Sequence, residues 1–460
     1  MSLDSWASKR IHKVLYGVGY FAAQVSYQSF VTFVFFFYVD VLRLNVQFAS
    51  LGWSIYGLWN AINDPIAGYI SDRTRTRWGR RIPYIAFGAP PLAISYLLVW
   101  IPSAFGVLSS DVGLFLYFTL TILLFDTIYT FTIINWIALF PEMYLELTER
   151  AEAENYVQIF GVIGLIAGMA LPPLIYGMLG WQWLGIIIGI LTLLTLIVSL
   201  FGSRERPEFA SEEALPLKEA VKSTLANKTF LLYVMPFFLL QFSLIVLTSV
   251  TPFYAKYVLE LDNVQTSIFL LAAFLSVLPA LALWSKITVS GGTKKAFTLS
   301  MMALSLALIP LAFAYNFITG LIIAVFIGIG LAGNLLVSEI ILAEIVDEDE
   351  LNTGKRREGM YYGIRALFMR SAIVLEAIIV GAVLTYFGYI PDLIPQPPMA
   401  VLGIRLLVSL IPVSSLILGI LVFIKYPLSG ERLRLVKERL EELHRKKRMM
   451  KLEDEELKRQ

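Results

Sequence analysis

Cysteine is missing from the chain of 460 residues, and histidine occurs only as His12 and His444. The absence of cysteine excludes a disulfide framework, a thiolate metal site and a cysteine nucleophile. Both histidines lie outside the long apolar segments, so a proton relay of imidazoles inside a membrane is also excluded. Thiol and imidazole chemistry therefore have no place in the interior of this protein.

Catalytic motifs are missing as well. The sequence contains no H-E-x-x-H zinc motif, no G-x-S-x-G nucleophile turn and no Walker lysine loop. These absences exclude transport driven by ATP hydrolysis within this chain, and we expect neither an enzyme nor a bound cofactor. An ion gradient, of H⁺ or Na⁺, or simple facilitated movement remains as the driving force.

Charged residues are scarce: they make up 16% of the chain, hydrophobic residues make up 57%, and the mean hydropathy is +0.72. A single water-soluble domain could not bury so much apolar surface. A hydrocarbon core about 30 Å thick needs roughly 20 apolar residues per helical crossing, and segments of this kind recur along the chain. We predict an all-α membrane protein with twelve transmembrane helices.

One apolar stretch allows two interpretations. Residues 155–201 carry no charge, and the stretch is about twice the length of one crossing. A break at Gly177–Gly180 gives two helices, whereas one very long tilted helix would leave an odd number of crossings. We prefer the break.

The few charges are unevenly placed along the chain. Basic residues crowd the loops that would share one side of the membrane, and the opposite loops hold little beyond Arg43 and Lys256. By the positive-inside rule, both termini and the central linker face the cytoplasm. We expect a multi-pass protein of the cell (plasma) membrane, a monomer in contact with membrane lipids that binds a small molecule and no nucleic acid.

The chain divides into two similar halves and a tail. A charge-rich linker at 203–228 separates residues 1–202 from residues 229–426, and each half holds six predicted helices. Two parallel six-helix repeats around a central cavity are typical of the major facilitator fold. Apolar residues at three- and four-residue spacing in the charged tail, residues 427–460, predict an amphipathic cytoplasmic helix. It lies either on anionic lipid headgroups or in a coiled coil with a partner.

Polar residues line one face of the second predicted crossing. Tyr56, Asn60, Asn63 and Asp64 follow at i, i+4, i+7 and i+8, which aligns them on one stripe of a helix. An uncompensated charge at membrane depth costs roughly 3 kcal/mol or more, so Asp64 is a candidate coupling site for a cation. The two asparagines either serve this site or only join neighbouring helices through hydrogen bonds.

Arg370 is the other deep charge, and arginine cannot lose its proton inside a membrane. It needs an anion, which is an acidic substrate or one of the acids Asp64, Asp126, Glu339 and Glu376. Such an ion pair could also serve assembly alone. Asp126 is a candidate substrate ligand or second coupling acid, unless it points toward the headgroups. We assign Glu376 no role, because snorkelling near the outer surface would relieve its cost.

An aromatic and polar cluster is a candidate substrate site. Tyr27, Tyr129 and Trp136 occur in the predicted crossings together with Gln24 and Gln158. Flat rings and amide groups suit the face and the hydroxyl groups of a sugar. Aromatic residues of membrane proteins also serve as packing and interfacial anchors, so the cluster alone permits either interpretation.

Two longer motifs carry a family resemblance. The segment NDPIAGYISDRTRTRWGRRIPY closely resembles the signature of the glycoside-pentoside-hexuronide:cation symporters, the melibiose permease type of major facilitator transporter. AEIVDEDELNTGKRREGMYYG resembles the loop between that family's tenth and eleventh helices. The similarity in outline extends from about Lys13 to Tyr426. It implies secondary active symport of a sugar or glycoside with a cation, by alternating access.

The resemblance also implies residues of the cation site. Asp64 matches one of the family's two cation-binding carboxylates, and Asn60 stands at the position of the other. Thr130 matches the family's threonine near this site, and Arg370 matches its lysine on the eleventh helix. One acid instead of two holds Na⁺ less well, so H⁺ is favoured as the coupling ion, with Na⁺ at Asp64 as the alternative.

The sugar site implied by the resemblance is altered. Gln24, Ile133 and Gln158 stand where the family has two carboxylates and an arginine that recognise the sugar. This departure leaves open a lysolipid or other amphipathic solute, which related symporters of the same fold carry. A membrane sensor that does not transport is a third interpretation, and it would need a partner protein.

A charged loop follows the second crossing. Asp72, Arg73 and Arg80 resemble the major facilitator loop that latches the outward-facing state through salt bridges and helix ends. The alternative is that these charges only set the topology.

Overall fold

The computed structural model describes residues 9–144, 146–205, 224–354, 357–440, 442–443 and 445, without the side chains of Asp72 and Leu147. Every regular element in these ranges is helical, as predicted for the all-α class. Most of the linker predicted at 203–228 lies outside the described residues.

The amino-terminal bundle contains α2 (Arg10–Phe36), α3 (Val46–Arg73), α4 (Ile82–Trp100), α5 (Asp111–Met143), α6 (Leu147–Leu179) and α7 (Trp181–Phe201). A π-helical segment, η1 (Phe37–Val41), extends α2. Two 3-10 helices, η2 (Pro102–Phe105) and η3 (Val107–Ser109), connect α4 to α5.

The carboxy-terminal bundle contains α9 (Lys228–Tyr257), α10 (Asn263–Leu275), α11 (Val277–Gly291), α12 (Thr293–Leu308), α13 (Phe317–Thr353), α14 (Glu358–Tyr386), α15 (Pro398–Val408) and α16 (Leu410–Phe423). A 3-10 helix, η5 (Ile309–Ala312), follows α12. The helices α10 and α11 together make one crossing, and so do α15 and α16.

Among the described residues, 11 helical segments are long and apolar enough to cross a membrane. They correspond to all but one of the twelve predicted crossings. The remaining helix, α3, is 28 residues long but less apolar, because it carries the polar stripe around Asp64. It packs against α5 in its own bundle and against α14 in the other, so the stripe lies inside the protein.

The uncharged stretch of residues 155–201 breaks between α6 and α7 at Gly180, which has a φ of +96°. Glycine adopts this left-handed backbone conformation without a steric penalty. The prediction of two helices in this stretch is therefore confirmed.

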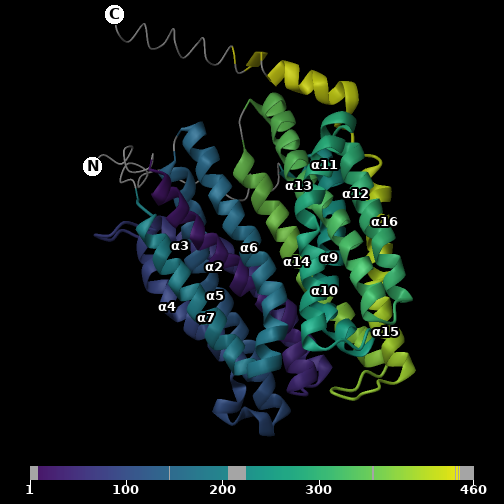
Figure 1. The fold of residues 1–460 in the computed structure, drawn as a ribbon. Coiled ribbons are helices and arrows are strands. Elements are labelled where there is room, and N and C mark those ends of the chain that lie inside the picture. Colours follow the sequence, from purple (N-terminus) through teal and green to yellow (C-terminus); the bar gives the residue numbers. More distant parts are fainter. Residues whose placement is uncertain are drawn as a thin grey trace, which may run out of the picture.

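The two bundles lie side by side (Figure 1). We call the end at which α2 begins and α16 ends the terminal end, and the opposite end the far end. The main helix contacts between the bundles pair α3 with α14, α6 with α10, and α2 with α9.

Glycines show where α3 and α14 are tightly packed. A Cβ added to Gly57 or Gly381 would lie 2.8 Å or 1.9 Å from a side chain of the facing helix. Closer to the terminal end, a Cβ added to Gly68 or Gly363 would meet nothing within 4 Å. These two helices are therefore in close contact toward the far end and apart toward the terminal end.

The start of the charged tail is helical at residues 430–440. Leu433 is half-buried and Leu440 is buried, so the predicted apolar stripe faces the protein. Arg432 forms an ion pair of 2.8 Å with Glu348 of α13. This part of the tail thus packs on the carboxy-terminal bundle, a contact that neither sequence interpretation included.

Candidate transport site

Asp64 lies at the contact between α3, α5 and α14. Its Oδ1 accepts a hydrogen bond of 3.2 Å from Thr130 of α5. Its Oδ2 pairs with the guanidinium of Arg370 of α14 at 3.1 Å. The side chain of Asp64 is 28% exposed and that of Arg370 is 18% exposed. The structure thus brings together three of the four residues predicted to bind the cation.

The fourth residue, Asn60, lies one turn away in the same contact. Its amide nitrogen donates to Asp126 Oδ1 of α5 at 2.5 Å, and the amide nitrogen of Asn63 donates to Asp126 Oδ2 at 3.1 Å. The hydrogen bonds Asn60–Asp126 and Asp64–Thr130 both join α3 to α5. The second bond lies four residues further along each helix than the first. Asp126 is buried beside the cation residues and is not among the residues that line the cavity.

Two oxygens in this contact have no protein partner. Asn60 Oδ1 and Asn63 Oδ1 are buried and accept no hydrogen bond from a described residue. Buried polar atoms are normally satisfied, so these oxygens are available to accept from a water or to coordinate a cation. Carboxylate, amide and hydroxyl oxygens suit a hard cation such as Na⁺, and a carboxylate alone suits H⁺.

A cavity of about 310 Å³ lies between the two bundles, beside Arg370. A cavity of this size is at the lower end of the range for small-molecule sites. Its polar lining includes Tyr27, Gln28, Gln241, Thr248 and Thr251. The rest of the lining is mostly apolar and comes chiefly from α9, α10, α13 and α14.

The predicted substrate residues divide into two sets. Tyr27 and Arg370 line the cavity, and the hydroxyl of Tyr27 accepts a hydrogen bond of 3.1 Å from Arg370. Tyr129 stacks on Tyr27, with ring centroids 5.4 Å apart. Gln24 accepts a hydrogen bond of 3.2 Å from Gln28, whose side chain lines the cavity. These residues therefore form or support one wall.

Trp136 and Gln158 lie elsewhere. Trp136 is 2% exposed, stacks on Tyr16 inside the amino-terminal bundle and donates to Ser199 Oγ at 2.8 Å. Gln158 is exposed on α6 and bonds Glu154 of the same helix at 2.6 Å. The structure does not group either residue with the cavity: Trp136 packs helices together, as most membrane aromatics do.

The sequence analysis missed the cavity residues of α9. Gln241, Thr248 and Thr251 are polar residues in an apolar helix, at spacings of seven and three. This spacing places them on one face, and it was the signal that could have identified them.

The structure also places Glu376, to which the sequence analysis assigned no role. The sequence left open a position near the outer surface, but Glu376 is 0% exposed and lies between the bundles. Trp53 Nε1 of α3 donates to its carboxylate at 2.9 Å, and Ser249 Oγ of α9 donates at 2.5 Å. Snorkelling therefore does not explain this acid.

Charged residues also join the bundles at the far end, in a cluster that we call the far-end latch. Lys256 of α9 pairs with Asp40 of η1 at 2.7 Å and with Asp392 at 3.1 Å. Arg43 pairs with Asp392 at 3.2 Å. Asp40 is fully buried, and it also accepts hydrogen bonds from the hydroxyls of Tyr257 and Tyr389, which completes the cluster. The hydrogen bond from Lys256, with a second from Arg43, lowers the pKa of the Asp392 carboxyl below its usual value.

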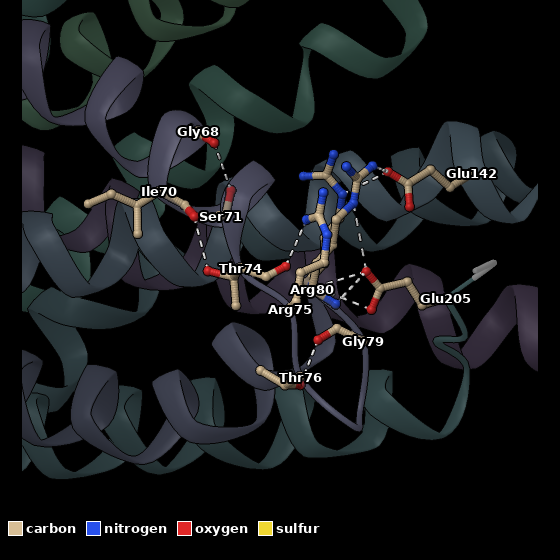
Figure 2. Close-up of polar contacts among 11 residues, drawn as sticks. Gly68, Ile70, Ser71, Thr74, Arg75, Thr76, Gly79, Arg80, Glu142 and Glu205 are labelled. Carbon is tan, nitrogen blue, oxygen red and sulfur yellow. Dashed lines mark hydrogen bonds and ion pairs between the residues drawn. The ribbon is translucent and has the colours of Figure 1, made fainter. Parts of the chain in front are cut away.

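The charged loop after α3 is held by contacts with α5 and with the start of the linker (Figure 2). Arg80 and Arg81 each bond Glu142 of α5 at 2.7 Å. The backbone N–H groups of the same two arginines donate to Glu205 at 2.9 Å. Arg73 instead stacks on Tyr69 of its own helix. The side chain of Asp72, the third predicted gate residue, lies outside the described residues.

Glu142→Gln is expected to destabilise the protein, because two arginines would lose one shared carboxylate. The three side chains are largely buried, so we expect a loss of about 2 kcal/mol in the free energy of unfolding. Thermal unfolding in detergent measures this loss. Glu438→Gln is the control, since its pair with Arg434 is exposed and should contribute little. Equal melting temperatures for the two variants would contradict the prediction.

Two bundles that meet around a cavity, with a carboxylate and a guanidinium paired beside it, define a membrane transporter for a small molecule. The chain belongs to the MFS/sugar transport protein family, whose family model matches residues 15–430. The predicted resemblance to the cation symporters of this superfamily is thereby confirmed.

Relatives with names extend this comparison. The chain is 26% identical to the uncharacterized symporter sll1374 of Synechocystis sp., over 93% of this chain and 96% of that protein. It is 23% identical to the sodium-dependent lysophosphatidylcholine symporter 1-A of Danio rerio, over 91% and 86%. It is 24% identical to YagG of Escherichia coli, provisionally named a glycoside/cation symporter, over 87% and 88%.

The fold is also that of a solved transporter. The crystal structure of the nucleoside transporter NupG superposes with a TM-score of 0.67 at 16% sequence identity and covers 90% of this chain and 100% of that one. At this identity the likeness concerns the fold alone.

Proposed function

We propose that this protein couples the movement of a cation through Asp64 to the uptake of a solute in the cavity. The observation that carries the proposal is the ion pair of 3.1 Å between Asp64 of one bundle and Arg370 of the other. A cation that neutralises Asp64 would weaken this pair, and a substrate could then engage Arg370. Binding in one bundle thereby changes the contacts between both, as alternating access requires.

The far-end latch and the tight packing of α3 on α14 support closure at the far end. If both termini face the cytoplasm, as the distribution of basic residues indicates, the state described is closed to the outside. The loop of Asp72, Arg73 and Arg80 would then act in the opposite state. The loop contacts drawn in Figure 2 join Arg80 to Glu142 of α5 and to Glu205 at the start of the linker.

The identity of the coupling ion depends on Asp126. The sequence favoured H⁺ because Asn60 replaces one of two acids. Asp126 Oδ1 lies 2.5 Å from that same asparagine, so a second carboxylate is supplied by α5 instead of α3. The argument against Na⁺ was that only one acid is present. Asp64 and Asp126 are two acids, and the amide oxygens of Asn60 and Asn63 lie nearby without a partner among the described residues, so H⁺ and Na⁺ are both candidates.

For the substrate we propose a sugar or glycoside. Arg370 Nε is buried and has no hydrogen-bond partner among the described residues, so it can donate to a substrate oxygen. Tyr27, Gln28 and Gln241 add groups suited to hydroxyls. The second candidate is a lysolipid or another amphipathic solute. The mostly apolar lining of the cavity favours it, and some relatives carry the name of lysophosphatidylcholine symporters.

Uptake into proteoliposomes tests the function. Radiolabelled glycosides and hexuronates would be compared with lysophosphatidylcholine, under an imposed H⁺ gradient or an imposed Na⁺ gradient. Accumulation of a sugar above its external concentration supports the proposal, and accumulation of the lysolipid alone supports the second candidate. Uptake that never exceeds equilibrium under either gradient would reject coupling.

Lys256→Met is expected to open the far end, because Asp40 and Asp392 would lose their shared cation. The chain has no cysteine, so cysteines introduced at Leu108 and Tyr386, in the two bundles at the far end, would be the only thiols. Both positions are exposed, at 48% and 85%. Spin labels there should show a longer distance in the variant. Lys437→Met, which removes an ion pair at the terminal end, is the control, and an unchanged distance in Lys256→Met would contradict the role of the latch.

A further inference from the structure

Glu376 is a buried acid with an unusual set of partners. Its carboxylate receives one hydrogen bond from Trp53 Nε1 and one from Ser249 Oγ, and it forms no ion pair with a described residue. Burial of an ionised carboxylate is costly unless a cation or several donors compensate for the lost water. Two neutral donors compensate for little of this desolvation cost, and the burial of a protonated, uncharged acid costs much less.

The charged residues of the helices around Glu376 have other partners. On its own helix, Arg370 pairs with Asp64 and bonds Tyr27. On α9, Lys256 pairs with Asp40 of the far-end latch. On α3, the facing residues Trp53 and Tyr56 are uncharged at neutral pH. No described cation of these three helices forms an ion pair with Glu376.

The hydrogen bond from Trp53 crosses between the bundles. Trp53 lies on α3 of the amino-terminal bundle, and Glu376 and Ser249 lie on α14 and α9 of the other. This bond lies on the far-end side of the pair Asp64–Arg370. Separation of the bundles at the far end must therefore break the bond and expose the carboxylate to water on that side.

We propose that Glu376 is a proton-binding site distinct from Asp64, and that it must be protonated before the far end can close. Exposed to water, the acid exchanges its proton with the external solution. On closure, the protonated acid is buried against Trp53 and Ser249. This assignment rests on the alternating-access transport proposed above, but it does not require that H⁺ is the ion bound at Asp64.

The closed state also keeps Glu376 apart from the cavity. Trp53 and Ile373 line the cavity, and Thr248 of α9 lines it beside Ser249. Trp53, one of its two hydrogen-bond donors, therefore separates Glu376 from the cavity. Glu376 can keep its proton while the cavity is open to the terminal side and return it to the external solution when the far end opens again, so no net proton transfer is required.

The distance between spin labels at Leu108→Cys and Tyr386→Cys tests this inference without a substrate. In protein reconstituted in lipid, the closed-to-open ratio should rise as the pH falls from about 8.5 to about 5.5, by up to roughly tenfold per pH unit for one coupled proton. Glu376→Gln, which mimics the protonated acid, should remain closed at every pH. Protonation of Asp392 or Asp40 would weaken the far-end latch and change the ratio in the opposite direction.

Three variants decide the outcome. Asp64→Asn should keep the pH response, because the response is assigned to Glu376, which this variant retains. Trp53→Phe keeps Glu376 but removes the donor across the bundles, so it should lower the closed-to-open ratio roughly fivefold. Glu348→Gln, a buried acid at the terminal end, should respond like the wild type.

A wild type with no pH response, or a response that survives in Glu376→Gln, would overturn the inference. A response lost only in Asp64→Asn would assign the proton to the coupling site, which leaves the proposed symport intact. The inference could hold even if uptake shows a coupling ion other than H⁺.

Discussion

Asp64→Asn protein is expected to lose concentrative uptake completely while it retains exchange of substrate between the two sides. The asparagine keeps one oxygen that can accept from Arg370, and its amide nitrogen can donate to the hydroxyl oxygen of Thr130, so the contact between α3, α5 and α14 can persist. It cannot take up a proton, and it has lost the formal charge that attracts Na⁺. The variant should therefore carry substrate only down its gradient.

Two assays in proteoliposomes measure this result: accumulation under an imposed ion gradient, and counterflow with substrate at equal concentration on both sides. Asp111→Asn is a suitable control, since Asp111 is exposed at the start of α5 and away from the site. Full accumulation by Asp64→Asn would refute the coupling role. Loss of both activities would show that the carboxylate is needed for the conformational change itself.

The sequence predicted the features that follow from local pattern. Twelve crossings and the break at Gly177–Gly180 depended on hydropathy. The family motif placed Asp64, Thr130 and Arg370 at one cation site, but the sequence left open which acid pairs with Arg370. Hydropathy alone would have missed α3, whose polar stripe makes it the least apolar of the crossings. The polar stripe lowers the hydropathy of α3, and the same stripe identifies the candidate cation site.

The sequence could not predict contacts between distant helices. Asp126 and Asn60 are 66 positions apart, and Glu376 and Trp53 are 323 apart. No periodicity within one helix indicates which face of another helix it meets. For the same reason Trp136 could be assigned to the substrate, although it packs inside its own bundle. The sequence analysis used Arg43 and Lys256 only in the topology argument, and both belong to the far-end latch.

Arg370→Met is expected to reduce uptake at least tenfold and to destabilise the protein. Arg370 donates to Tyr27 and to Asp64, each at 3.1 Å, so methionine would remove both bonds and leave Asp64 without a cation. Breaking a buried pair costs about 3–5 kcal/mol. Because 28% of the Asp64 side chain is exposed to solvent, we expect roughly 2 kcal/mol here. The uptake and stability of Arg370→Lys should lie between those of the wild type and Arg370→Met. Lysine keeps the charge, but it lacks the two guanidinium nitrogens that donate to Tyr27 and to Asp64.

The double variant Asp64→Asn/Arg370→Met separates stability from coupling. Replacement of both partners of a buried ion pair by neutral groups is often tolerated, so its melting temperature in detergent should return close to that of the wild type. Its concentrative uptake should stay absent, because neither the cation site nor the substrate donor remains. If the double variant were as unstable as Arg370→Met, the pair would not be the cause of the lost stability. If it accumulated substrate, coupling would have to reside in another acid, and Asp126 and Glu376 would be the residues to replace next.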